Sequence, residues 1–431
     1  MSIAYGGVIA FLFRIANLGV ALGTVLLTSD QLGDAGRGTF VLGVTVVGVA
    51  AAMTGGLTAS TAYQIANQGR PPLGVLLNAG APALALALVV FLVSGGIAGG
   101  ASGELSGIAV PVGASVAAVL IHSVVTGVLL GQEAFVRYNT ALVLPPALSL
   151  VAIAVTIWGL GETGPEATLV AFAVGQWAAV PLVLALVLSA SRAFGGFEPA
   201  LVRALAGFGL LAALASTISY LNYRADLFVV DHFEGRDGVG VYGNAVYIAE
   251  SVWLLSSSLA LAAYARLGTL GAQEAALLTA RIVRHTMVAL GVVCVGIFVL
   301  ADVLVDVLFS EEFAGMTDSL RILLPGTLIY GMAAALSGYY TYHRGQPWFA
   351  AVIAGLALAI DLALAVLLVP VMGVEGAAVA TSLSYALAMV LAVAVFARHS
   401  GTAPLALLRF GREDVADYRA LATRLRAAAG R

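Results

Sequence analysis

The sequence of 431 residues has no lysine, a single cysteine and few charged residues of either sign. The lone Cys294 excludes an intramolecular disulfide and a metal site built on cysteines. Charged residues make up 10% of the chain, hydrophobic residues make up 61%, and the mean hydropathy is +1.02. This composition excludes a soluble globular domain and indicates a chain that lies in lipid.

Long apolar runs dominate the sequence. Twelve of them are about 20 residues long, the length at which a helix spans roughly 30 Å of hydrocarbon. The first run shows no positive cluster before it and no cleavage site after it, so we expect a retained helix instead of a signal peptide. The prediction is an all-α polytopic membrane protein with twelve transmembrane helices, at 5–28, 38–62, 73–97, 107–130, 139–160, 167–190, 206–230, 239–263, 286–309, 319–341, 349–370 and 375–397.

The arginines are distributed unevenly over the loops that join these runs. Fifteen lie in the even-numbered loops and the C-terminal tail, whereas the odd-numbered loops hold only Arg37, Arg236 and Arg321. Cytoplasmic loops carry the excess of positive charge in membrane proteins, so both termini are expected in the cytoplasm. The odd-numbered loops are too short for a catalytic domain, and we expect no enzyme activity.

An internal repeat organises the chain. Gly36-Arg37-Gly38-Thr39-Phe40 resembles Gly238-Val239-Gly240-Val241-Tyr242, and Pro111 with Gly131-Gln132 recurs as Pro325 with Gly345-Gln346. Two halves of six helices each share one orientation and are related by an axis along the membrane normal. The predicted division is an N-terminal lobe over 1–192, a cytoplasmic linker over 193–205, a C-terminal lobe over 206–397 and a cytoplasmic basic tail over 398–431, of which Glu413 to Arg431 is typical of a short amphipathic helix.

Two arginines lie inside apolar runs, Arg14 in the first and Arg224 in the seventh. A charge at the bilayer centre costs on the order of 2.5 to 3.5 kcal/mol, which favours a functional reason for keeping it. Guanidinium stays protonated and offers a planar fork of donors suited to a phosphate. Asn17 lies one turn from Arg14, and Thr217 and Tyr220 precede Arg224 at helical spacing. These five residues are the predicted substrate-binding set; the alternative is that each arginine forms a structural ion pair or extends to the interface.

Acidic residues inside the predicted spans form a second set of candidates. Asp226, Glu250 and Asp361 could carry a proton or a sodium ion, or could neutralise the arginines. Glu250 and Asp361 lie near mid-span, whereas Asp226, Asp302 and Asp306 are expected to be partly solvated near helix ends. We expect no metal and no other cofactor.

Further polar and aromatic residues have a structural interpretation that is the more common one. His122, Gln64 and Asn67 could line a cavity, but a packing histidine or a hydrogen bond between helices is more usual. Tyr339, Tyr340 and Tyr342 could stack on sugars, but their position favours the interfacial aromatic belt.

Two stretches carry a resemblance to a known family. Tyr220-Leu221-Asn222-Tyr223-Arg224-Ala225-Asp226 with the following Val239-Gly240-Val241-Tyr242, and Pro370-Val371-Met372-Gly373-Val374-Glu375-Gly376-Ala377-Ala378, resemble bacterial polysaccharide flippases. Those are members of the MATE-like multidrug/oligosaccharidyl-lipid/polysaccharide (MOP) superfamily, and the resemblance covers about residues 5 to 397. It implies a V-shaped, two-lobed transporter of a prokaryotic cell (inner) membrane. By alternating access, such a protein moves an undecaprenyl-pyrophosphate-linked oligosaccharide, of the O-antigen type, to the outer leaflet.

The resemblance also implies partners and leaves alternatives. The expected partners are the lipid-linked oligosaccharide and membrane lipids, with association with a polysaccharide polymerase or export machinery and no nucleic acid; the chain is expected to be a monomer. A MATE-type cation-coupled antiporter shares the architecture, but it would be expected to have a carboxylate in the first helix, where this chain has Arg14. A membrane-embedded polymerase or glycosyltransferase would need a large outer loop that the sequence does not contain.

Overall fold

The computed structural model describes residues 3–100, 104–191, 193–407 and 409–411, and residues 414, 418, 419 and 423 of the tail. Within these residues all regular secondary structure is helical, which confirms the all-α fold class. Most of the predicted amphipathic helix over 413–431 lies outside the described residues. The α-helices are α1 Ile3–Ala66, α2 Pro72–Gly100, α3 Glu104–Gly131, α4 Phe135–Ala154, α5 Pro165–Ala190, α6 Pro199–Leu221, α7 Asp226–Ser251, α8 Trp253–Leu267, α9 Ala272–Leu308, α10 Met316–Tyr330, α11 Ala333–Gly338, α12 Trp348–Met372 and α13 Val374–Ser400.

Ten helical segments of the described chain are long and apolar enough to cross a membrane. Their outward faces carry large apolar side chains such as Leu211, Val307 and Val371, which are 74%, 75% and 82% exposed, as expected of a multi-pass membrane protein. The predicted number of twelve crossings stays a prediction. Helix α1 is 64 residues long and joins two helices across a non-helical Gly33, and α7 contains a similar break at Gly235. Glycine is suited to both positions because their φ angles are 67° and 72°.

Four predicted segments differ from the structure: 239–263 is divided between α7 and α8, 319–341 is divided between α10 and α11, and two others differ as follows. The run at 206–230 is interrupted: α6 ends at Leu221, four residues form tight turns, and α7 begins at Asp226. The amides of Tyr223 and Arg224 bond to carbonyls three residues earlier, so the chain tightens here instead of continuing as an α-helix. Helix α9 begins 14 residues before the predicted 286, because a helix extends beyond the apolar run that hydropathy detects.

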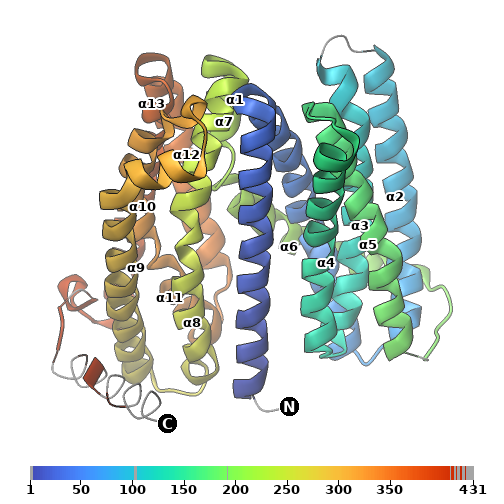
Figure 1. Ribbon diagram of the computed structural model, residues 1–431. Helices are drawn as coiled ribbons and strands as arrows, with labels where there is room; N and C mark the ends of the chain where they lie inside the picture. The colour runs from blue at the N-terminus through green and yellow to red at the C-terminus, as the bar shows by residue number, and fades with distance from the viewer. Residues whose placement is uncertain are drawn as a thin grey trace.

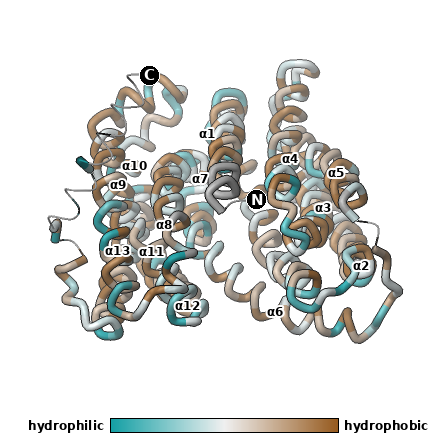
Figure 2. The backbone as a smooth tube through the Cα atoms, turned by 90° about the horizontal axis from the view of Figure 1, so that it is seen from below, coloured by the Kyte–Doolittle hydropathy of each residue, from teal (hydrophilic) through white to brown (hydrophobic). Residues whose placement is uncertain are grey.

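The helices form two bundles with α1 between them (Figure 1). Seen from below, α2 to α5 group on one side and α7 to α13 on the other (Figure 2). Each bundle has its own hydrophobic core: Val75, Val128 and Val183 belong to one, and Leu227 and Leu320 to the other. Helix α6 packs closely against the second part of α1. A Cβ added to Gly56 would lie 1.9 Å from the carbonyl oxygen of Gly209, so only glycine fits there.

The two halves meet through a reciprocal pair of backbone contacts. A Cβ added to Gly38 would lie 1.8 Å from the carbonyl oxygen of Arg236, and one added to Gly240 would lie 2.2 Å from that of Asp34. Both pairs of equivalent residues are separated by 202 positions, the spacing of the glycine motif in the sequence repeat. The contact is therefore of the two-fold kind, in which each half offers the same surface to the other.

Candidate functional site

Three adjoining cavities lie between and within the bundles. The arginine cavity, of about 330 Å³, is lined by residues of both bundles, including Arg37, Gln176 and Arg224. The serine cavity, of about 230 Å³, lies among α6, α8, α12 and α13 and includes Ser256 and Ser257. A connecting cavity of about 500 Å³ shares Tyr220 with the first, and Ser219, Tyr223 and Ala350 with the second. The three cavities thus form one series.

The end of α6 separates the two outer members of this series. Ser219 and Tyr223 line the serine cavity, whereas Tyr220 and Arg224 line the arginine cavity. Residues four apart lie on the same side of a helix, and the residue that follows each of them points in another direction. Ser219 and Tyr223 therefore face one cavity, and Tyr220 and Arg224 face the other. A single segment thereby supplies both walls.

Arg37 is the most unusual charged residue of the arginine cavity. Its side chain is 3% exposed, and its Nε donates to Oδ1 of Asn244 at 3.0 Å while Nη1 donates to Oγ1 of Thr28 at 2.9 Å. The guanidinium also lies 5.7 Å from the ring centre of Phe40. No acidic side chain of the described chain pairs with it. A buried charge without a counter-charge has a high desolvation cost, so binding of an anion beside Arg37 would be favourable.

Arg37 also joins the two halves of the chain. Asn244, which accepts from Arg37, donates through Nδ2 to Oγ of Ser29 at 2.8 Å. The guanidinium therefore belongs to a buried hydrogen-bond network that links α1 with α7. An anion that binds Arg37 in place of Asn244 would therefore weaken the hydrogen bonds between α1 and α7.

Arg224 lines the same cavity but has a counter-charge. Its Nη1 lies 2.7 Å from Oε2 of Glu250, and the two side chains are 20% and 13% exposed. The Glu250 carboxylate also accepts from the Tyr385 hydroxyl at 3.4 Å. The pair Arg224–Glu250 adds donors to the cavity without adding net charge. The sequence prediction left binding and pairing open for these two residues, and the structure brings them together.

Asp226 and Asp361 form a separate buried cluster. They are 3% and 2% exposed, and Thr381 connects them, with Oγ1 at 3.0 Å from Oδ1 of Asp361 and 3.4 Å from Oδ2 of Asp226. The Tyr242 hydroxyl donates to Asp226 at 2.6 Å. Within the described chain neither carboxylate forms an ion pair with an arginine. The expectation that Asp226 is partly solvated is wrong, because α7 begins at this residue and packs it against α13.

The other predicted substrate-binding residues lie apart from the arginine cavity. Arg14 is exposed and donates through Nη1 to Oγ of Ser257 at 3.1 Å, which places it against the serine cavity. Asn17 is exposed, and the hydroxyl of Thr217 donates to the carbonyl of Ala213 in its own helix. Of the five predicted residues, Tyr220 and Arg224 line one cavity together.

Of the residues for which a structural role is the more common interpretation, some are buried and others are exposed. His122 is buried, with Nε2 at 3.0 Å from the carbonyl oxygen of Gln176; Gln64 is buried and Asn67 is exposed. The aromatic belt is wrong for Tyr339 and Tyr340, which are each 1% exposed and pack on Phe396 and Phe349. Tyr342 is exposed.

Sequence reasoning missed Arg37 and the serines. The distribution of arginines places Arg37 in an outer loop, because it follows the first apolar run closely. The signal that could have identified it is the repeat itself: its partner by position is the apolar Val239, which indicates that this position faces the protein interior. Serine is common in membrane helices, and Ser256 and Ser257 gave no comparable signal.

No protein-family model matches the chain. Part of the sequence is similar to the probable low-salt glycan biosynthesis flippase Agl15 of Haloferax volcanii, with 24% identity over 193 residues. That region is 44% of this chain and 41% of the Haloferax protein, so the match spans less than half of that relative.

Solved structures resemble the chain over almost its whole length. An inward-facing MATE multidrug-resistance transporter of the MOP superfamily matches with a TM-score of 0.75 at 17% identity, covering 92% of this chain and 98% of that one. The lipid II flippase MurJ, in an inward closed conformation, matches with a TM-score of 0.71 at 14% identity, covering 91% and 87%. A Pyrococcus furiosus MOP transporter with a binding pocket of reversed polarity matches at 0.68 and 16%, covering 94% and 95%. These likenesses show that the chain has the MATE-like fold.

Proposed function

We propose that this protein is a flippase of the MOP superfamily that moves a glycan on a polyprenyl pyrophosphate across the membrane. The observation that carries the proposal is the buried Arg37, which has no acidic partner in the described chain and lies beside Arg224 in a cavity between the bundles. A guanidinium held in such a site favours an anionic group with several oxygens, and a pyrophosphate provides them. The partial similarity to Agl15 supports a glycan as the cargo.

The identity of the lipid carrier and the direction of transport are inferred from the resemblance to polysaccharide flippases. We take the carrier to be undecaprenyl pyrophosphate, the direction to be from the cytoplasmic to the outer leaflet, and the product to be a cell-surface polysaccharide of the O-antigen type. The series of three cavities supports alternating access, because it offers polar groups at successive positions from the space between the two bundles into the second bundle, and the bundles can rock against each other. Arg14 stands at one end of the series and Arg37 at the other.

The test is a flipping assay with the purified full chain in liposomes. A fluorescent undecaprenyl-pyrophosphate oligosaccharide is added, and the fraction that a membrane-impermeant quencher can reach is followed with time. We expect faster exchange between leaflets than in protein-free liposomes and than with Arg37→Met. Exchange at the protein-free rate, together with efflux of an organic cation such as ethidium, would overturn the proposal in favour of the antiporter.

The buried cluster of Asp226 and Asp361 favours a second candidate function, cation-coupled antiport, or ion coupling of the flippase itself. Two carboxylates and two hydroxyls, from Thr381 and Tyr242, offer only oxygen ligands, the kind that small hard cations prefer, and one of the carboxylates could instead hold a proton. Transport is measured with imposed sodium and proton gradients. Stimulation of glycan exchange by either gradient would support coupling of the flippase, whereas stimulation of ethidium efflux alone would support the antiporter.

A further inference from the structure

We propose that the serine cavity is a binding site for one neutral sugar residue of the transported glycan. The inference rests on the proposed function, because a lipid-linked glycan is what would bring a sugar into the membrane. It concerns a cavity distinct from the arginine cavity and residues that the sequence did not single out. Its volume of about 230 Å³ is below the roughly 300 to 1,000 Å³ of sites for drug-sized ligands and fits a single ring.

Three of the serine hydroxyls that line the cavity favour a ligand that donates hydrogen bonds. Ser219 donates to the carbonyl of Ala215 at 2.9 Å, Ser256 to that of Trp253 at 3.0 Å, and Ser257 to that of Leu254 at 3.1 Å. Their protons are used within their own helices, so toward the cavity these oxygens act as acceptors. A ligand with several hydroxyl donors satisfies them, whereas a phosphate, which has mainly acceptors, does not.

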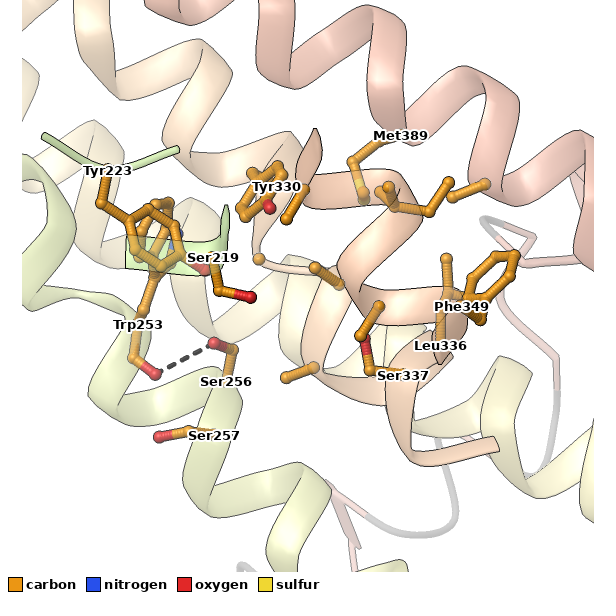
Figure 3. A pocket seen from close by; sticks show the side chains of 17 residues that line it. Ser219, Tyr223, Trp253, Ser256, Ser257, Tyr330, Leu336, Ser337, Phe349 and Met389 are labelled. Carbon is orange, nitrogen blue, oxygen red and sulfur yellow. Dashed lines mark hydrogen bonds between the residues drawn. The ribbon is translucent and has the colours of Figure 1, made fainter. Parts of the chain in front are cut away.

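Aromatic rings close the two ends of the cavity. Figure 3 shows Tyr223 and Trp253 together at one end and Phe349 at the other, with the serines between them. The indole N–H of Trp253 is used by the carbonyl of Thr327 at 2.8 Å, so the ring contributes its apolar surface. Aromatic faces are electron-rich and attract the polarised C–H bonds that line one face of a sugar ring. Hydroxyl acceptors flanked by aromatic faces are the pattern that a pyranose needs.

The charges around the cavity favour a neutral ligand over a cationic one. Its lining contains no acidic and no basic residue. Arg14 donates to the lining Ser257 at 3.1 Å and would repel an organic cation, whereas the acidic Glu250, behind the lining tyrosines, is neutralised by Arg224. The aromatic rings alone would otherwise suit a cation as well as a sugar. The site is therefore specific for a neutral, hydroxyl-rich ligand.

The test uses the full chain in lipid nanodiscs and saturation-transfer difference NMR, which detects weak binding. The neutral probes are the methyl glycosides of glucose, galactose and mannose; tetraphenylphosphonium is the cationic probe and inorganic pyrophosphate the anionic one. We expect at least one glycoside to bind, and the double variant Ser256→Ala/Ser257→Ala to weaken it about tenfold, because two hydrogen bonds are lost. Ser258→Ala is the matched control: Ser258 also donates to the carbonyl of Leu254, at 2.5 Å, but does not line the cavity.

The outcomes separate this inference from the proposed function. Glycosides that do not bind, or that bind the double variant as well as the wild type, overturn the sugar site, and flipping of the labelled lipid would then still support the flippase. If tetraphenylphosphonium binds the wild type and the double serine variant loses that binding, the cavity is a cation site and the sugar site is overturned. Glycoside binding that follows the serines, without any flipping, supports the sugar site and overturns the flippase. Thermal unfolding of each variant confirms that a loss of binding is not a loss of fold.

Discussion

The arginine cavity and the serine cavity lie on two sides of the same turn of chain, yet their polar groups are opposite in kind. The first presents donors with a net positive charge, from Arg37 beside the neutralised pair Arg224–Glu250. The second presents uncharged oxygens between aromatic rings. A charged head and a neutral body of one ligand would therefore be held at separate places. The difference also predicts that substitutions in the two cavities have different consequences.

Replacing Arg37 should have the largest effect on transport. We expect Arg37→Met to weaken pyrophosphate binding about 100-fold, since about two charge-assisted hydrogen bonds of roughly 1.5 kcal/mol each are lost, and to abolish flipping. Its melting temperature should change little, because the relieved desolvation cost of the buried guanidinium is offset by the lost hydrogen bonds to Thr28 and Asn244. Calorimetric titration and thermal unfolding measure the two effects. Arg321→Ala, at an exposed ion pair with Asp302, is the control; if Arg37→Met transports at the wild-type rate, the arginine cavity is not the anion site.

Replacing Arg224 should affect stability more than binding. Arg224→Ala leaves Glu250 largely buried and unpaired, which we expect to cost about 3 kcal/mol of unfolding free energy. The double variant Arg224→Ala/Glu250→Gln should recover most of that loss. Equilibrium unfolding in denaturant measures each variant. If the double variant is as unstable as the single one, the ion pair is not the reason for keeping both charges.

Asp361 tests whether the carboxylate cluster acts separately from both cavities. We expect Asp361→Asn to remove the response of flipping to a sodium or proton gradient and to leave pyrophosphate binding within about twofold, because additivity holds for sites without shared partners. Flipping assays with and without the gradients provide the comparison. Asp302→Asn, on an exposed carboxylate, is the control. An equal loss of anion binding would mean that the cluster and the arginine cavity are one site.

Arg14 should matter less than the sequence suggested. It is exposed, and its one hydrogen bond to a described group goes to Ser257. Water competes for this exposed bond, so its loss corresponds to about 0.5 to 1.5 kcal/mol, and we expect Arg14→Ala to slow flipping about threefold to tenfold. Complete loss of transport would show that Arg14 is a main anion-binding residue, and the proposed difference between the two cavities would be weakened.

The smallest effect is expected far from both cavities, where the tail contacts α9. Burial opposes ionisation of Asp414, but hydrogen bonds from Arg284, at 2.8 and 3.0 Å, and from the Gly411 amide outweigh it and lower the pKa of that carboxyl. A lowered folded-state pKa stabilises the contact above the unfolded value of about 3.9, and the contribution is lost as the pH falls through the folded value. Limited proteolysis should therefore release the tail at neutral pH in Asp414→Asn, but in the wild type only in strong acid. Flipping should be unchanged; a change would connect the tail to the cavities.

Hydropathy predicted the helices because burial in lipid requires long apolar runs, whatever their detailed packing. It could not detect the turns at Asn222 to Ala225, where apolar and polar residues alternate without glycine or proline. Charged residues inside runs, such as Arg224, Glu250 and Asp361, were recognisable because each one is costly in lipid. Their partners were not, since pairing across helices depends on the rotation of each helix.

Arg37 shows the limit of loop assignment. It lies four residues after Gly33, and the sequence does not reveal that the chain bends back so tightly that Arg37 reaches Thr28. The serine cavity depends on the same kind of information. Ser219, Ser256 and Phe349 come from three helices that are far apart in sequence.

The reciprocal contact of Gly38 and Gly240 makes this single chain resemble a homodimer whose subunits have been joined. Each half supplies a bare glycine and receives the other's carbonyl, so the register between them depends on backbone shape as well as on the side-chain bonds of Arg37 and Asn244. We expect the polypeptide, if divided in the segment between Ala190 and Pro199, to reassemble from two co-expressed fragments. Other side chains would be tolerated at positions 34 and 236, which contribute only their carbonyls to this contact, whereas even alanine at 38 or 240 would keep the fragments apart.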